Sequence, residues 1–106
     1  MSSKMVILRV DTVTFAKALA DETRQKIMAL CCCGEMSVSD LAAKTGVAQP
    51  TVSHHLKILK DAGLVRSRRE GKEIFYALDQ ARLANGCCQV AENFAPGVTV
   101  KIEIEK

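Results

Sequence analysis

Long apolar runs are absent from this chain of 106 residues. No stretch approaches the roughly 18 apolar residues that a membrane-spanning helix needs. The longest early apolar stretch, residues 5–8, is far shorter than the core of a secretion signal and lacks a small-residue cleavage site. We therefore expect a cytoplasmic protein with no membrane partner. The length suits a single domain with one modest core, which excludes a multi-domain enzyme.

The residues that a thiol enzyme or a nucleotide-dependent enzyme needs are also missing. The sequence contains no Cys-x-x-Cys pair and no glycine-rich phosphate loop, and neither His54 nor His55 is placed to relay a proton to a cysteine. It contains no internal repeat, low-complexity segment or linker rich in Pro, Gly and Ser. These absences indicate one continuous domain that is not an enzyme, so a redox catalyst or metal reductase is the weakest functional hypothesis.

Positive charge is concentrated in one part of the chain. Of the 15 Lys and Arg residues, six lie in residues 49–72 together with only two of the 12 acidic residues. This segment therefore carries a net charge of +4, whereas the remaining nine basic and ten acidic residues nearly balance. A basic excess confined to one stretch is typical of a nucleic-acid-binding surface, although on charge alone a solvated charged face is the better interpretation.

Capping residues and apolar spacing predict three helices in the first half of the chain. The first covers residues 11–20, and Asp21 caps a second helix that we expect to stop at Gly34. Ser37 begins a short third helix, which ends at Gly46.

A longer helix is predicted from Gln49, with Pro50 in its first turn, where the missing N–H costs nothing. Ala48 stands at its N-cap, where the absence of a capping side chain costs about 1 kcal/mol. The buried stripe consists of three aliphatic residues, Val52, Leu56 and Leu59. Two helices joined by a short turn containing Gly form a helix-turn-helix, whose second helix enters the major groove of DNA.

A basic β-hairpin, or wing, is predicted next, from residues 64–70 and 73–78 around Gly71. Asp79 can cap a last helix, and residues 98–104 alternate as a terminal strand with which residues 5–10 could pair. The apolar stripe of the last helix consists of Leu83, Cys87, Val90 and Phe94.

Five segments, in the same order, make the chain resemble the ArsR/SmtB family of bacterial winged-helix repressors. The likeness runs from about Phe15 to Leu83. The matching segments are residues 18–24 (ALADETR), 34–41 (GEMSVSDL), 49–57 (QPTVSHHLK), 62–65 (AGLV) and 69–72 (REGK).

This resemblance implies a mainly α fold with a β-wing, and a homodimer formed through the first and last helices. It implies a repressor that binds operator double-stranded DNA and releases it when an inducer binds. We assign residues 1–106 to a single winged helix-turn-helix domain. Its parts are the N-terminal helices (11–33), the helix-turn-helix (37–62), the wing (64–78) and a C-terminal dimerisation and sensor segment (79–106).

The candidate DNA contacts lie on the outward arc of the recognition helix and on the wing. Gln, Ser and Thr can hydrogen-bond base edges, whereas basic side chains favour phosphates. Because hairpin side chains alternate, only one face of the wing can reach DNA. His55 leans toward the buried side, so we expect it to pack. The candidates are Gln49, Pro50, Thr51, Ser53, His54, Lys57, Arg66, Arg68, Arg69 and Lys72.

Two metal sites of the family are disfavoured by substitutions. Ser37 and Ser39 stand where arsenite, cadmium and lead sensors carry thiolate ligands, so the resemblance implies that this site is absent. The family's zinc site needs Asp, His and Glu along the last helix, which here has Asp79 and Glu92 but no His. A zinc or nickel sensor is therefore disfavoured.

Five cysteines remain, in two clusters near the second helix and in the last helix: Cys31, Cys32, Cys33, Cys87 and Cys88. Clustered thiols in a reducing compartment indicate metal binding or redox sensing rather than a disulfide framework. We take all five as candidate ligands for an inducer, with As(III) first and Cd(II), Pb(II) or Hg(II) as alternatives, and expect no obligatory cofactor. Cys31 and Cys87 lie on apolar stripes and fit a buried core position equally well.

A second hypothesis keeps the fold and changes the signal. Reactive sulfur or an oxidant would convert two thiols to a disulfide or polysulfide bridge. Some members of the family use one cysteine of the second helix and one of the last helix in this way. Their second-helix cysteine corresponds to a position near Ala29, so the match is imperfect.

Overall fold

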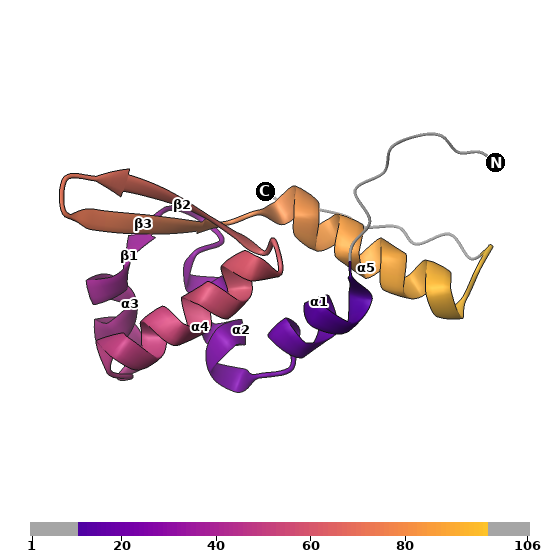
Figure 1. The fold of residues 1–106 in the computed structure, drawn as a ribbon, viewed down its shortest axis with the longest axis horizontal. Helices are drawn as coiled ribbons and strands as arrows, with labels where there is room; N and C mark the ends of the chain where they lie inside the picture. Colours follow the sequence, from indigo (N-terminus) through magenta and orange to yellow (C-terminus); the bar gives the residue numbers. More distant parts are fainter. Residues whose placement is uncertain (1–10, 98–106) are drawn as a thin grey trace.

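The computed structural model describes residues 11–97, which form five helices and a small sheet. In chain order these are α1 (Thr12–Leu19), α2 (Glu22–Leu30), β1 (Met36–Ser37), α3 (Val38–Thr45), α4 (Gln49–Asp61), β2 (Val65–Glu70), β3 (Glu73–Leu78) and α5 (Gln80–Phe94). The antiparallel sheet has the order β1-β3-β2. The β2–β3 hairpin extends from one end of the molecule and α5 lies at the other (Figure 1). The predicted winged helix-turn-helix is confirmed.

Four of the five helices begin at a side chain that accepts hydrogen bonds from free backbone N–H groups, which stabilises the first turn. These N-caps are Asp11, Asp21, Ser37 and Asp79. Gly46 ends α3 with a φ of 75°, a conformation that glycine adopts without strain. As predicted, Ala48 opens α4 with no side-chain cap.

The core lies around α4. Val52, Leu56 and Leu59 are fully buried, as their spacing predicts, and α4 packs against α2, α3 and β2. Leu41 and Leu64 are fully buried in the same core. This burial holds one face of α4 inward and leaves its polar face exposed.

The second helix is shorter than predicted. It ends at Leu30 rather than at Gly34, because the Cys31 carbonyl accepts a hydrogen bond from the Leu78 N–H (3.1 Å) and the Cys31 side chain enters the core. Cys32 and Cys33 therefore lie in a turn that leads to β1. The sequence did not predict β1, since a strand of two residues is too short to show alternation.

The apolar stripe predicted for α5 is only partly buried. Its other two members are half-buried, but Cys87 is exposed and the Phe94 side chain is 84% exposed. The α5 residue that is buried against α1 is Gly86, where a Cβ atom would overlap the ring of Phe15. Among the described helices and strands, α5 packs mainly against α1.

The predicted strand at residues 98–104 and its partner segment 5–10 lie outside the described residues. Within residues 11–97, no helix is both long and apolar enough to cross a membrane.

Candidate nucleic-acid interface and thiol sites

The exposed face of α4 carries all six predicted contacts of the recognition helix. Gln49, Pro50, Thr51, Ser53, His54 and Lys57 are exposed. Lys57 pairs with Asp61 on the next turn (Nζ to Oδ2 3.2 Å), but both side chains are largely solvated. Such a surface pair contributes little free energy, so it does not prevent Lys57 from exchanging its partner for a phosphate.

The basic residues of the wing lie on both faces of the hairpin, because alternate strand residues point to opposite sides. Arg68 is held on one face by protein partners: Nη2 lies 2.7 Å from a Glu35 oxygen and Nη1 lies 2.8 Å from a Glu70 oxygen. Its guanidinium also lies over the Phe75 ring, 5.2 Å from the centroid. The hydrogen bonds from Arg68 hold the pKa of Glu35 below its ordinary value. Arg68 therefore ties the wing to the turn before β1.

The other basic residues of the wing are held less firmly by protein partners, so they are freer to contact DNA. Arg66 lies beside Asp79 (Nε to Oδ2 3.8 Å), near the base of the hairpin. Arg69 and Lys72 are exposed, and neither makes an ion pair with any residue in 11–97. The Lys60 ammonium donates to the Ser67 hydroxyl (2.6 Å), a link between α4 and the wing that no sequence pattern indicated.

The two histidines differ in role. His54 is exposed, whereas His55 is half-buried and its Nδ1 lies 2.9 Å from Nη1 of Arg24. Arg24 also donates to the carbonyls of Lys17 (3.0 Å) and Ala18 (2.8 Å). His55 thus connects the recognition helix to α1 and α2 through a polar contact, in addition to the packing that its position predicts.

The first thiol cluster contains two different environments. Cys31 is 1% exposed and belongs to the core, and burial raises the pKa of its thiol to about 11. Cys32 and Cys33 are exposed, and their Sγ atoms lie 3.2 Å apart. The contact with the Cys33 thiol raises the pKa of Cys32.

The structure does not bring the two thiol clusters together. Gln80, at the start of α5, donates to the Cys32 carbonyl (3.2 Å), whereas Cys87 lies seven residues further along the helix. Seven residues of α-helix span about 10 Å. Within the described part of the chain, no three His, Cys, Asp or Glu residues are placed to hold a metal ion. A site joining both clusters would therefore need a second chain or a rearrangement.

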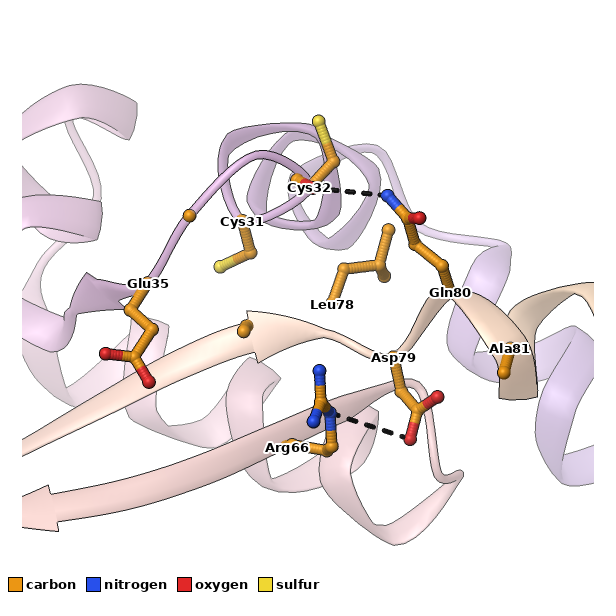
Figure 2. A pocket seen from close by; sticks show the side chains of 10 residues that line it. Cys31, Cys32, Glu35, Arg66, Leu78, Asp79, Gln80 and Ala81 are labelled. Carbon is orange, nitrogen blue, oxygen red and sulfur yellow. Dashed lines mark hydrogen bonds and ion pairs between the residues drawn. The ribbon is translucent and has the colours of Figure 1, made fainter. Parts of the chain in front are cut away.

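A hollow of about 590 Å³ lies between the turn after α2, the end of β3 and the start of α5. Cys32, Glu35, Arg66, Asp79 and Gln80 are among its lining residues (Figure 2). Figure 2 shows the Cys32 carbonyl bound by Gln80, while the Cys32 sulfur points away from the hollow.

Comparisons with known proteins agree with this geometry. Residues 21–67 match the family described as "Bacterial regulatory protein, arsR family". A probable mercury resistance operon repressor of Streptomyces lividans is 38% identical over 88 residues, covering 79% of this chain and 70% of that protein. An arsenical resistance operon repressor of Staphylococcus aureus is 41% identical over 70 residues, covering 66% and 67%. The solved ArsR-like transcriptional regulator from Rhodococcus sp. RHA1 has a TM-score of 0.71 at 31% identity, covering 78% and 76%.

Proposed function

This chain belongs to the bacterial ArsR family of DNA-binding transcriptional regulators, and from that premise we propose that it represses transcription until a thiophilic metal or metalloid ion binds its cysteine thiolates. It is a regulator and not an enzyme. The observation that carries the DNA-binding part is the exposed polar face of α4, held outward by a fully buried opposite face.

In this proposal α4 enters the major groove. The residues that would face base edges are Gln49, Thr51, Ser53 and His54. Pro50, in the first turn of α4, would fix how closely that turn approaches the DNA. Lys57, Arg69 and Lys72 would neutralise phosphates. Arg66, like Lys57, would exchange a carboxylate partner for a phosphate. Arg68 would contribute less, since its guanidinium must first leave two carboxylate partners.

The partner at the other end of the molecule is a second copy of the chain. Val13 on α1 is 61% exposed and Phe94 on α5 is 84% exposed. Exposed apolar residues on two adjacent helices fit a symmetric interface between identical chains. Such a dimer would present two recognition helices to half-sites about one helical turn apart.

The inducer is best sought among thiophilic ions. Two of the relatives are described as a probable mercury resistance operon repressor and an arsenical resistance operon repressor, and thiolate-only ligand sets select soft ions. We place As(III) first and Cd(II), Pb(II) and Hg(II) after it. A coupling free energy of about 1–3 kcal/mol would lower DNA affinity roughly 5- to 150-fold.

Thiol oxidation is the second candidate signal. The exposed Cys32 and Cys33 sulfurs, 3.2 Å apart, are accessible to an oxidant or a persulfide donor. Such a switch would use the same fold and the same DNA surface.

The test starts from reduced protein under anaerobic conditions and a DNA site selected from a random-sequence pool. The complex is titrated separately with arsenite, cadmium and a persulfide donor. Release by arsenite or cadmium near one equivalent per site, reversed by a competing dithiol, supports the metal sensor, whereas release by the persulfide donor alone supports the redox switch. Failure to select any DNA sequence would contradict the repressor itself.

The DNA surface is tested in the same assay. Lys57→Ala and Arg69→Ala should each weaken binding to all sequences and reduce the salt slope of log K by about 0.9 per lost phosphate contact. Lys26→Ala, on the exposed side of α2, is the matched control. An unchanged slope would remove the substituted residue from the phosphate contacts.

A further inference from the structure

A second hollow, of about 520 Å³, lies at the base of the wing, between the end of α4, the start of β2 and the start of α5. Three basic side chains line it, one from each of these elements: Lys60, Arg66 and Arg82. Asp79 is the only carboxylate among the lining residues in 11–97, so three positive charges face one negative charge. The lining therefore keeps an excess charge of +2, which suits an anion.

The guanidinium groups of Arg66 and Arg82 are held only loosely by the protein. Their Nε atoms lie 3.8 and 4.0 Å from the same Asp79 oxygen, which is beyond hydrogen-bond distance (Figure 2 shows the Arg66 pair). By contrast, Arg24 and Arg68 each donate at least three hydrogen bonds to protein partners. Since a guanidinium carries five N–H donors, Arg66 and Arg82 have donors available for a ligand.

The local backbone and a neighbouring hydroxyl complete the hollow. Gly63 follows α4 with a φ of 78°, and a Cβ atom there would lie 2.8 Å from Nη1 of Arg82. Because glycine has no Cβ, the guanidinium can lie against the backbone at this point. On the other side, the Lys60 ammonium donates to the Ser67 hydroxyl (2.6 Å). A hydroxyl that accepts a hydrogen bond still carries its own hydrogen, so Ser67 can donate to a ligand.

We propose that this hollow binds a phosphate group, with Arg66 and Arg82 donating to its oxygens and Lys60 supplying a third positive charge. Forked guanidinium donors match the oxygens of a phosphate, and hydrogen bonds between charged groups are stronger than neutral ones. Asp79 stays in place as the N-cap of α5, because its Oδ1 accepts from the Arg82 backbone N–H (3.0 Å). The site uses no thiol and is separate from the proposed inducer site.

Two sources carry this chemistry. A small phosphorylated molecule would fill the hollow in the absence of DNA, whereas a phosphate of the DNA backbone would fill it only in the complex. The second source rests on the proposed function. Lys60 is exposed and lies three residues after Lys57 on α4, so the hollow continues the proposed DNA surface. Either occupant would join α4, the wing and α5, because each element contributes one of the three cations.

Binding without DNA is tested by isothermal titration calorimetry of the full chain with inorganic pyrophosphate at low salt. We expect a dissociation constant of about 1 mM or lower. Arg82→Gln and Lys60→Gln should each weaken binding at least about 5-fold, because each removes a charged donor that faces the ligand. Lys26→Gln, which removes a similarly exposed charge on α2 (61% against 58% for Arg82), is the matched control. Pyrophosphate binding that neither Arg82→Gln nor Lys60→Gln weakens would overturn the site.

Two further variants test the placement of Arg82 without removing its charge. Arg82→Lys loses the forked donors, and Gly63→Ala adds a Cβ that displaces the guanidinium, so each should weaken pyrophosphate binding at least about 2-fold. Gly71→Ala is the control for Gly63→Ala, since Gly71 also has a positive φ (63°) but nothing lies within 4 Å of the added Cβ. Circular dichroism checks that the glycine variants fold. Wild-type affinity in Arg82→Lys would overturn the forked contact, whether or not they do.

The source of the phosphate is tested by the salt dependence of DNA binding. If a DNA phosphate fills the hollow, Arg82→Gln should reduce the salt slope of log K by about 0.9. If the ligand is a small phosphorylated molecule, the slope should stay at its wild-type value while pyrophosphate still binds the protein alone. An unchanged slope together with no pyrophosphate binding would overturn the site. Because the calorimetry contains no DNA, its result stands even if the protein selects no DNA sequence and the repressor fails.

Discussion

The two ends of the molecule differ in how fully their apolar side chains are buried. At the proposed DNA-reading end, α4 buries all three residues of its apolar stripe and exposes a polar face of defined orientation. At the other end, the described residues pack α5 mainly against α1, and Phe94 is 84% exposed. The core therefore fixes the orientation of the proposed DNA surface, whereas apolar side chains at the α1–α5 end, such as Val13 and Phe94, are exposed.

The largest expected effect comes from truncating a buried side chain of α4, compared with an exposed one of α5. Leu56→Ala removes a fully buried side chain, so the free energy of unfolding should fall by about 2–5 kcal/mol. Phe94→Ala removes a larger but exposed side chain and should change it by less than about 0.5 kcal/mol in dilute protein. Urea unfolding measures both changes. Equal losses of unfolding free energy would contradict the difference in burial between the two ends.

A second substitution tests the packing of α5 against α1 at Gly86. A Cβ at Gly86 would overlap the Phe15 ring, so Gly86→Ala should lower the free energy of unfolding by about 1–3 kcal/mol through overpacking. Gly34→Ala is the control, because nothing lies within 4 Å of the added Cβ there. Stabilisation by Gly86→Ala, as helix propensity alone predicts, would show that α5 is not held against Phe15.

The reading end can also be made more stable. Ala48 gives α4 no side-chain cap, so Ala48→Ser should raise the free energy of unfolding by about 0.5–1 kcal/mol. Ser37→Ala at the start of α3, which removes an existing cap, should lower it by about 1 kcal/mol. A thermal or urea transition that does not move with Ala48→Ser would contradict the assignment of this N-cap.

The smallest effect concerns pH and the link between wing and turn. Arg68 lowers the pKa of Glu35, so the folded state binds this proton less tightly than the unfolded state. The stabilisation is therefore complete above the unfolded glutamate pKa of about 4.3 and is lost as pH falls through the lower folded value. The difference in urea midpoint between wild type and Glu35→Gln should shrink from pH 7 to pH 3. A difference that is constant over this range would exclude the ion pair as its cause.

The sequence predicted the parts of the fold that depend on local chemistry. Pro50, the α4 stripe and the N-caps Asp21 and Ser37 act within one or two helical turns, so their spacing was sufficient. The pairing of Arg68 with Glu35 joins residues 33 positions apart, and nothing in the local pattern indicates it. The early end of α2 depends on a backbone hydrogen bond from Leu78, which also moved Cys32 and Cys33 from a helix to a turn.

We propose that DNA binding and inducer sensing use separate parts of the chain. The most direct test replaces all four exposed cysteines by serine and measures affinity for a selected DNA site with and without arsenite. The variant should bind the site with wild-type affinity and show no arsenite-induced release, while wild type is released. Release from the variant, or loss of its DNA binding in a folded protein, would contradict the claim.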